Sequence, residues 1–314
     1  MVLRIWTHVS IAWWIEKAFE RSTTTGNTTL MIFAKSPRGW KIPEYSEEQF
    51  EVWLENRKTF DQYGWMIHSN YIANLSKPAS DSQTERNSII HDFICADKLW
   101  YESINVHVGK EKDRKDKDEA MKNMQENVSL ILQELKDKKL NHIQYLFENT
   151  AGQWSEIWST IEELWYFYKN YLSDLPVKFT IDTAHLQWWG EDFWDWNLFL
   201  EKFDEHVGIE QLHSIHLNDS KAILWSNLDR HASLGRWFVG RPRFIGCIQR
   251  AVKTDTPMYI ETPEPEHWAD EVEKVKMIAR GVTDWIEDFH QQHYQTQFLK
   301  KFEHMRVEEQ WGLF

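Results

Sequence analysis

Histidine and carboxylate side chains of the kind that bind metal ions gather between residues 215 and 235. His216 ends an apolar segment, and Asp219 follows it closely. Further on, Asp229 and His231 are separated by one residue. Residues two apart in an extended segment point to the same side, so this pair can reach one cation. A single Asp-x-His is more often a locally hydrogen-bonded loop pair, so a metal site here requires ligands from elsewhere in the chain.

Similar residues recur at corresponding places along the whole chain. Each comes at, or just past, the end of a short apolar segment that we predict to be a strand. These residues are His8, His68, His107, Glu148, Asp182, His216 and Glu261. Chance can place one or two polar groups in this way, but seven at eight strand ends indicate a functional constellation.

The candidate ligands are imidazoles and carboxylates without thiolates, which suit Zn, Mn or Fe better than a cysteine-based structural zinc site. The full set is His68, His107, Glu148, Asp182, His185, His216, Asp229, His231 and Glu261. Nine ligands are too many for one four- or five-coordinate ion, and they suit two or three ions with bridging carboxylates. Such clusters stabilise the attacking and leaving oxygens of phosphate-ester hydrolysis. The residues therefore predict a multi-metal hydrolase with an anionic substrate, and no Ser-His-Asp, GxGxxG or Walker A motif is visible.

The elements that must position these residues alternate between strands and helices. We expect strands at 3–5, 29–33, 64–67, 103–106, 144–147, 177–181, 212–215 and 258–260. We expect helices at 11–21, 46–60, 80–99, 118–136, 155–172, 195–206, 241–251 and 268–280. Eight alternating units with right-handed crossovers close into a parallel α/β barrel, a (β/α)8 or TIM barrel, whose active site lies at the carboxyl ends of the strands. This predicts one barrel domain over residues 1–280 and a short helical C-terminal extension over 281–314.

Composition narrows the setting in which this barrel works. The length of 314 residues suits one α/β barrel. A net charge of −13 argues against binding nucleic acid over a whole face, although it leaves room for a local basic groove. Cys95 and Cys247 lie far apart, which indicates reduced thiols and a cytoplasmic location. We expect no membrane association, because the N-terminus does not read as a signal peptide and no apolar run approaches the roughly 18 residues that span a bilayer.

The chain resembles the type IV apurinic/apyrimidinic endonucleases, the endonuclease IV family, over roughly residues 1–280. The matching segments are THVS (7–10), IHSNYIANL (67–75), NVHVG (105–109), FENTAGQ (147–153), IDTAH (181–185), IHLNDSK (215–221), LDRHASLG (228–235) and IETP (260–263). The resemblance implies a (β/α)8 barrel with three zinc ions, or manganese in their place. It implies a DNA-repair enzyme that hydrolyses the phosphodiester 5′ to an abasic site in double-stranded DNA and leaves a 3′-hydroxyl. We expect it to act as a monomer.

The same resemblance assigns the nine candidate ligands to three ions. One ion would be held by His68 and His107, with Glu148 bridging to a second ion. The second ion would be completed by Asp182, His216 and Glu261, and the third would be held by His185, Asp229 and His231.

The resemblance also implies catalytic and DNA-binding roles. Glu148 or Glu261 would orient or deprotonate the attacking hydroxide. Arg38 and Tyr71 match residues that enter the DNA at the lesion, a role that suits both because each stacks on bases. A local basic rim is expected from Arg230, Arg236, Arg241 and Arg243. One departure from the family pattern lies after His107, where Pro-Gly-Ser is replaced by Val-Gly-Lys.

A larger departure concerns tryptophan, because the chain has 19 Trp and only 12 Gly. Tryptophan stands where the family pattern has glycine at Trp6, Trp13, Trp14, Trp100, Trp154, Trp158, Trp225, Trp237 and one or both of Trp188 and Trp189. About ten such changes at roughly 1–3 kcal/mol each would exceed the roughly 5–15 kcal/mol stability of a domain. One hypothesis is that these positions are UGA codons that the cell reads as glycine. TGA codons in the gene would support it and TGG codons would contradict it; the alternative is a chain that tolerates the tryptophans.

Two rival functions remain open on the sequence. A sugar isomerase or epimerase uses the same barrel with carboxylate and histidine ligands to one or two divalent ions. The third set of ligands, His185 with Asp229 and His231, argues against it. The other rival is an inactive metal-binding or DNA-binding relic whose site is blocked by tryptophan, which would bind zinc without nicking DNA.

Overall fold

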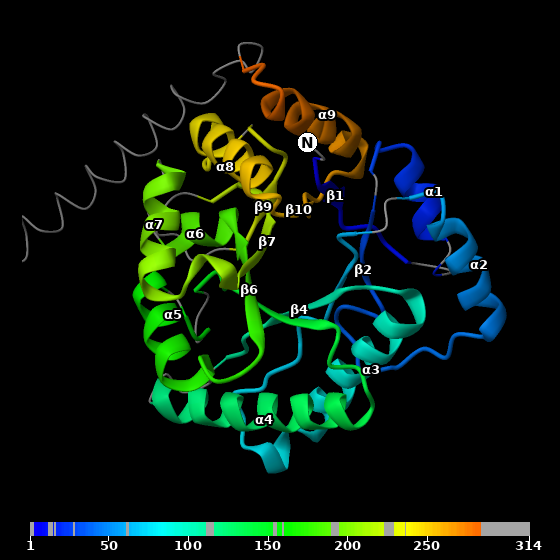
Figure 1. Ribbon diagram of the computed structural model, residues 1–314, viewed down its shortest axis with the longest axis vertical. Helices are drawn as coiled ribbons and strands as arrows, with labels where there is room; N and C mark the ends of the chain where they lie inside the picture. Colours follow the sequence, from blue (N-terminus) through cyan, green and yellow to red (C-terminus); the bar gives the residue numbers. More distant parts are fainter. Residues whose placement is uncertain are drawn as a thin grey trace, which may run out of the picture.

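Eight parallel strands form a nearly closed barrel in the computed structural model (Figure 1). The structure describes residues 3–11, 15, 17–27, 29–60, 63–110, 116–152, 156–158, 160–189, 195–222, 229–235 and 237–283. The barrel strands are β1 (Ile5–Thr7), β2 (Met31–Phe33), β3 (Met66–His68), β4 (Ser103–His107), β5 (Gln144–Glu148), β6 (Val177–Asp182), β7 (Leu212–His216) and β10 (Met258–Ile260). The predicted α/β barrel is therefore confirmed.

The strands follow one another around the barrel in chain order, and the first and last meet. β1 pairs with β10 through the whole of its length, from Ile5 opposite Met258 to Thr7 opposite Ile260. Between β1 and β2 the ring is completed by a single parallel bridge from His8 to Met31. The Val9 amide donates to the Met31 carbonyl across this gap at 2.8 Å. All eight carboxyl ends therefore lie around one mouth.

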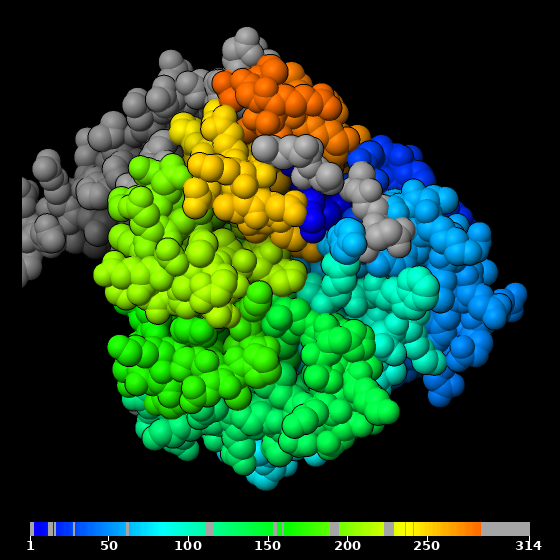
Figure 2. Space-filling model, viewed as in Figure 1, coloured from blue at the N-terminus to red at the C-terminus, as the bar shows by residue number. Residues whose placement is uncertain are grey.

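Helices connect successive strands and cover the outside of the barrel (Figure 1). They are α1 (Lys17–Thr23), α2 (Glu47–Arg57), α3 (Gln83–Leu99), α4 (Lys117–Asp137), α5 (Ile161–Phe167), α6 (Thr183–Trp189), α7 (Trp196–His206), α8 (Arg241–Thr254) and α9 (Trp268–Ala279). Short turns at Ala79–Asp81, Ile209–Gln211 and Pro265–His267 are 3-10 helices, and Tyr168–Leu172 continues α5 as a π-helix. The first and last parts of the barrel lie side by side (Figure 2), where Lys276 Nζ donates to the Gly26 carbonyl.

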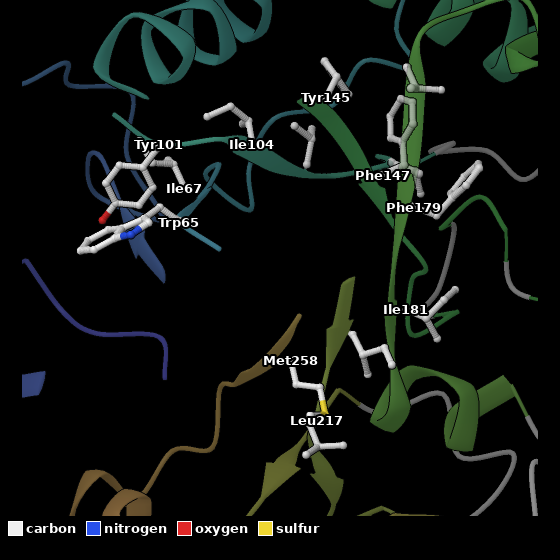
Figure 3. Packing of buried hydrophobic residues seen from close by; sticks show 14 of the residues in the cluster. Trp65, Ile67, Tyr101, Ile104, Tyr145, Phe147, Phe179, Ile181, Leu217 and Met258 are labelled. Atoms are coloured by element: carbon white, nitrogen blue, oxygen red, sulfur yellow. The ribbon is translucent and has the colours of Figure 1, made fainter. Parts of the chain in front are cut away.

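The apolar residues form two layers because successive strand residues point to opposite faces. Inside the barrel, Trp6 and Tyr259 pack with methionine and leucine side chains, and their ring centroids lie 5.0 Å apart. Between the strands and the helices lies a larger cluster, part of which is drawn in Figure 3. There Trp65 meets Tyr101 edge to face at 5.4 Å. This double layer fixes the strands, and so fixes where their polar ends lie.

Several boundaries differ from those predicted, each for a local reason. β1 begins two residues later than expected, which places Trp6 inside the barrel. The helix expected from 155 begins at Ile161, because the Thr160 side chain accepts the Glu163 amide and caps it. A helix that we did not predict, α6, starts directly after β6, where Asp182 accepts the amide of Ala184 at 2.7 Å.

Other expectations meet the structure only in part. Of the predicted C-terminal extension over 281–314, residues 284–314 lie outside the described residues. Cys95 and Cys247 are buried and form no disulfide. Within the described ranges, no helix is both long and apolar enough to cross a bilayer.

Backbone strain affects only some of the described tryptophans at family glycine positions. Of the positions in question, Trp13, Trp14, Trp154 and Trp225 lie outside the described residues. Among those described, Trp100 and Trp158 have positive φ angles of 59° and 64°. Trp6 lies in a strand and Trp188 in a helix, so neither backbone is strained there. Among the described positions, the strain of about 1–3 kcal/mol therefore applies to Trp100 and Trp158.

Trp100 occupies the place where glycine usually ends a helix. It follows Leu99, the last residue of α3, in the left-handed conformation. The Tyr101 amide donates to the Ala96 carbonyl at 2.8 Å, and the Trp100 amide donates to the Asp97 carbonyl. These two bonds define a Schellman motif, in which glycine is favoured because it has no Cβ to clash. The indole is 61% exposed, so little burial offsets the strain.

We predict that Trp100→Gly stabilises the protein by about 1 kcal/mol, because it removes the left-handed penalty of a residue with a Cβ. Urea unfolding followed by circular dichroism measures the change. Lys139→Gly is the matched control, since Lys139 has φ of 61° in the same motif after α4. A loss of stability on Trp100→Gly, alongside a gain on Lys139→Gly, would show that the indole contributes more than the strain costs.

Candidate metal centre

Six of the nine metal-ligand candidates lie at, or just past, the carboxyl ends of barrel strands, as the spacing predicted. His68, His107, Glu148, Asp182 and His216 are each the last residue of their strand. Strand register sets neighbours directly opposite each other: His107 pairs with Glu148, and Asp182 pairs with His216. The apolar pattern fixes the register of the strands, and this register places the candidate ligands side by side.

Ligand atoms from these side chains form overlapping groups, within each of which all the atoms lie no more than 4.8 Å apart. The groups are His68, His107 and Glu148; Glu148, Asp182, His216 and Glu261; Asp182, His185 and His231; and His68, His216 and Glu261. Glu148 belongs to the first and second groups and Asp182 to the second and third, so a carboxylate joins each of these neighbouring groups. This connectivity suits several cations with shared carboxylates.

Glu148 lies at the centre of the arrangement and is buried. Its Oε2 lies 3.3 Å from His68 Nε2 and 3.2 Å from His107 Nε2. Its Oε1 lies 3.0 Å from His216 Nδ1 and 3.5 Å from His185 Nδ1. One carboxylate thus faces imidazoles from four different segments of the chain, which is the geometry of a bridging ligand.

Glu261 stands just past the end of β10 and meets two imidazoles. His216 Nδ1 lies 2.9 Å from one oxygen, and His8 Nδ1 lies 2.7 Å from the other. His8 was among the strand-end residues of the sequence but not among the predicted ligands. The structure places it against Glu261, where it orients that carboxylate.

The segment around His231 is organised by a short antiparallel pair that the sequence analysis missed. β8 (Asp219–Ser220) pairs with β9 (His231–Ala232). The buried Asp219 carboxylate accepts the amides of Trp237 and Val239, each at 2.9 Å, and so anchors the loop that follows. Burial raises the pKa of Asp219 to about 6, although these backbone bonds oppose the rise.

Asp229 lies at the edge of the centre rather than within one of the close groups. Its Oδ1 is 3.6 Å from His231 Nε2, and its side chain is 44% exposed. Asp182 lies near both His231 and His185. Its Oδ2 is 3.5 Å from His231 Nε2 and 3.8 Å from His185 Nε2. His185 and His231 can therefore share an ion with either carboxylate.

Electrostatics in this cluster pairs every buried carboxylate with imidazoles. Burial opposes ionisation of Glu148, but His216 and His107 outweigh it and hold its pKa well below the usual range. Burial likewise opposes protonation of His216, but the two neighbouring glutamates raise its pKa well above the ordinary value. Burial also opposes protonation of His107, His185 and His231, and nearby carboxylates raise their pKa values. Positive charge is thus strongly favoured here.

The residues fit a metal cluster by their own chemistry. Three carboxylates buried at one barrel mouth are costly to ionise unless cations lie between them. The Nε2 atoms of His216 and His231 are buried and form no hydrogen bond with the described residues. Such nitrogens and carboxylate oxygens are the ligands of zinc and of manganese.

Asparagines that the sequence analysis did not select hold the ligands in place. Asn105 donates to Glu148 Oε2 at 2.6 Å, and Asn218 donates to Asp182 Oδ2 at 2.8 Å. Asn149 accepts the Asp182 amide at 2.6 Å. Each asparagine stands one or two residues from a ligand, in the segments NVH, FEN and IHLN, and that adjacency was the available signal. Partners of this kind tune ligand orientation and metal affinity.

A cavity of about 1100 Å³ opens over the cluster and brings the expected DNA-binding residues to it. Its lining includes Arg38, Tyr71 and Arg230 together with His107, Glu148 and His231. The Tyr71 ring lies 5.2 Å from the rings of both His68 and His107.

The rest of the predicted basic rim is not supported by the described structure. Arg243 is buried and donates to the Val239 carbonyl, so that prediction was wrong. Arg236 and the side chain of Arg241 lie outside the described residues.

Comparison with known proteins places this geometry in a family. Residues 19–278 match the model of the xylose isomerase-like TIM barrel. A probable endonuclease 4 of Chlorobium phaeobacteroides is 31% identical, over 85% of this chain and 95% of its own. Another, from Halothermothrix orenii, is also 31% identical, over 88% of this chain and all of its own. The chain belongs to the endonuclease IV family.

A solved structure of the same family agrees with this assignment. Endonuclease IV from Thermus thermophilus superposes with a TM-score of 0.76 at 27% identity, over 88% of this chain and 99% of that one. A D-tagatose 3-epimerase-like protein superposes with a TM-score of 0.69 at 16% identity, which shows a common fold alone. The resemblance to endonuclease IV predicted from the motifs is therefore confirmed.

One tryptophan lies directly against the candidate metal centre. Trp188 is buried and stacks on the His231 ring, with centroids 5.8 Å apart and planes 11° apart. Its Nε1 donates to Ser220 Oγ at 2.7 Å. The indole lies beside His231, and His231 still lines the cavity, so Trp188 does not block the site.

We predict that zinc binding releases protons and tightens as the pH rises. The carboxylates raise the pKa values of His107, His185, His216 and His231, so below those values protons occupy the nitrogens that a metal needs. Calorimetric titration of the metal-free protein with zinc, near pH 7 in two buffers of different ionisation enthalpy, measures the release. Equal heats in both buffers would contradict the expectation.

Proposed function

We propose that this protein is a DNA-repair endonuclease that hydrolyses the phosphodiester 5′ to an abasic site and leaves a 3′-hydroxyl. The observation that carries the proposal is the cluster of buried carboxylates and imidazoles at the mouth of the barrel, joined through Glu148 and Asp182. Family membership supports the substrate class, since the relatives are probable endonucleases. The enzyme would act on double-stranded DNA as a monomer in the cytoplasm.

Three zinc ions, or manganese in their place, would be held by the groups described above. His68, His107 and Glu148 would hold the first, and Glu148, Asp182, His216 and Glu261 would hold the second. His185, His231 and Asp229 would hold the third, with Asp182 beside it. When bound, such ions supply Lewis-acid stabilisation of the phosphate and lower the pKa of water.

The chain's own groups prepare the site for hydrolysis. Glu148 and Glu261 have pKa values well below the usual range, so both are ionised and can accept a proton or a hydrogen bond from the attacking water. Glu261 is held at both oxygens, by a hydrogen bond with His8 and by an ion pair with His216. A carboxylate held on both oxygens orients water with little freedom, and this favours the reactive geometry.

DNA would be bound at the mouth of the cavity rather than over a whole face. Arg38 and Tyr71 line this cavity, and a base stack opened at the lesion would meet their guanidinium and aromatic planes there. Lys77, Lys110 and Lys221 also line this cavity, with Arg230. These cations would supply the local attraction for phosphate that the net charge of −13 does not, and each lysine would exchange a glutamate partner, Glu85, Glu156 or Glu264, for phosphate.

The two rival functions give different results in one assay. Purified protein is incubated with a duplex that carries one abasic site, with an undamaged duplex, and with ketoses. Nicking 5′ to the abasic site supports the endonuclease. Ketose conversion without nicking would indicate an epimerase, and zinc binding without either activity would indicate a relic.

We predict that Glu261→Gln abolishes nicking while largely retaining zinc. Glutamine keeps the shape of the side chain and one coordinating oxygen but removes the charge that accepts the proton. Nicking rates on the abasic duplex and metal content by mass spectrometry measure the two effects. Glu273→Gln, on the exposed side of α9, is the control. Unchanged nicking by Glu261→Gln would remove this glutamate from the catalytic assignment.

We predict that Tyr71→Ala weakens binding to the abasic duplex by about 1–3 kcal/mol, the contribution of one base–aromatic stack. Tyr166→Ala is the control, because Tyr166 is exposed on α5 and lies outside the cavity lining. Fluorescence anisotropy measures the affinity. Both variants carry Glu261→Gln as well, which prevents turnover during the measurement. The affinity of both proteins should fall as salt rises, because phosphate contacts release counterions. A flat salt response would count against DNA as the substrate.

A further inference from the structure

A buried glutamate outside the metal cluster joins two of the segments that carry its ligands. Glu271 lies on α9 and is 1% exposed. Its Oε1 accepts the backbone amide of Leu234 at 2.7 Å. Its Oε2 accepts the hydroxyl of Thr262 at 2.6 Å. Leu234 lies three residues after His231, and Thr262 directly follows Glu261, so one carboxylate ties both ligand segments to the same helix.

The rest of the β10–α9 region supports the same two segments. Ser233 donates to Glu264 Oε2 at 3.1 Å, and Trp268 Nε1 donates to the Thr262 carbonyl at 3.0 Å. The His231 segment has only the two-residue strand β9, paired with β8, and Glu261 lies just past the end of β10. Contacts from the β10–α9 region add to the β8–β9 pairing in setting the relative position of the two segments, and Glu271 accepts hydrogen bonds from both.

Burial of the Glu271 carboxylate costs desolvation free energy, which indicates that the charge has a function at this place. Burial raises the pKa of Glu271, and its bonds to Thr262 and Leu234 oppose the rise. A leucine or methionine would anchor α9 against the barrel without that desolvation penalty. What an apolar side chain cannot do is accept hydrogen bonds from two ligand segments at once.

We propose that Glu271 is a positioning residue that holds His231 and Glu261 at the separation which the second and third metal sites require. The inference rests on the proposed metal centre. His231 belongs to the group with Asp182 and His185, and Glu261 belongs to the group that also contains Asp182. The two sites share Asp182, so a shift between the two segments alters both. Partners that orient metal ligands from outside typically change affinity by about 10–100-fold.

The test compares four variants by metal affinity. Glu271→Met removes both hydrogen bonds and keeps an apolar chain of similar length. Glu271→Gln keeps them, since its carbonyl oxygen accepts the Leu234 amide and its amide group donates to Thr262 Oγ1. Glu273→Met is the control on the same helix, where the side chain is 56% exposed. His231→Ala marks the loss of one ion.

Zinc affinity is measured by competition with a chromophoric chelator, and zinc content by mass spectrometry after dialysis. We expect Glu271→Met to lower the affinity of two of the bound ions by about 10–100-fold, while Glu271→Gln and Glu273→Met match the wild type. Thermal unfolding of the metal-free proteins separates this effect from a general loss of stability. Should Glu271→Met fail to fold, Thr262→Val removes one of the two bonds and is expected to give the same effect at smaller size.

Three results would overturn the inference. In the first, Glu271→Met unfolds more easily but binds all ions as the wild type does, which would reduce Glu271 to an anchor of α9. In the second, Glu271→Gln binds metal as poorly as Glu271→Met, which would exclude the two hydrogen bonds as the cause. In the third, Thr262→Val leaves affinity unchanged when Glu271→Met cannot be studied. A wild-type protein that binds no zinc would instead overturn the proposed centre itself, and this outcome is distinct from the other three.

Discussion

The structure depends on the burial of three carboxylates, Glu148, Asp182 and Glu261, against imidazoles at one end of a parallel barrel. Charges removed from water are costly, and here the cost is offset only because each carboxylate faces imidazoles and can share a cation. Strand register determines which side chains point into the mouth. A slip of one residue in β6 would turn Asp182 away from the mouth and put its neighbour there. The apolar double layer below, with its alternating inward and outward side chains, opposes that slip.

Around the charged groups, the neutral side chains of three asparagines fix the geometry without adding charge. Asn105 and Asn218 donate to carboxylates, and Asn149 accepts a backbone amide from the neighbouring strand. The carboxylates Asp219 and Glu271 act at longer range, where each gathers backbone or hydroxyl donors from a loop. The rigid strands carry one part of the ligand set, and loops bound by these buried acceptors carry the other. The positions of the candidate ligands therefore depend on residues that are not ligands themselves.

The sequence predicted the barrel and the strand-end donors because both follow from local patterns. Apolar runs mark the strands, and parallel strands bring their carboxyl ends together, so His107 and Glu148 could be placed side by side without coordinates. The contacts that could not be predicted join segments distant in the chain. The pairing of β8 with β9, the bond from His8 to Glu261 and the reach of Glu271 to Leu234 all depend on how loops fold back over the mouth. No periodicity in the sequence encodes these approaches.

The tryptophans at family glycine positions differ from one another in backbone strain and in burial. Trp6 and Trp188 sit in regular elements and are buried, so each gains contacts without backbone strain. Trp158 is strained but fully buried, and its burial can offset a cost of about 1–3 kcal/mol. Trp100 has the strain without the burial. A chain that had adapted to tryptophan would be expected to relieve such a position first, because an exposed helix end accepts glycine or asparagine freely. The indole at Trp100 is thus the described position that most favours a glycine codon read as tryptophan.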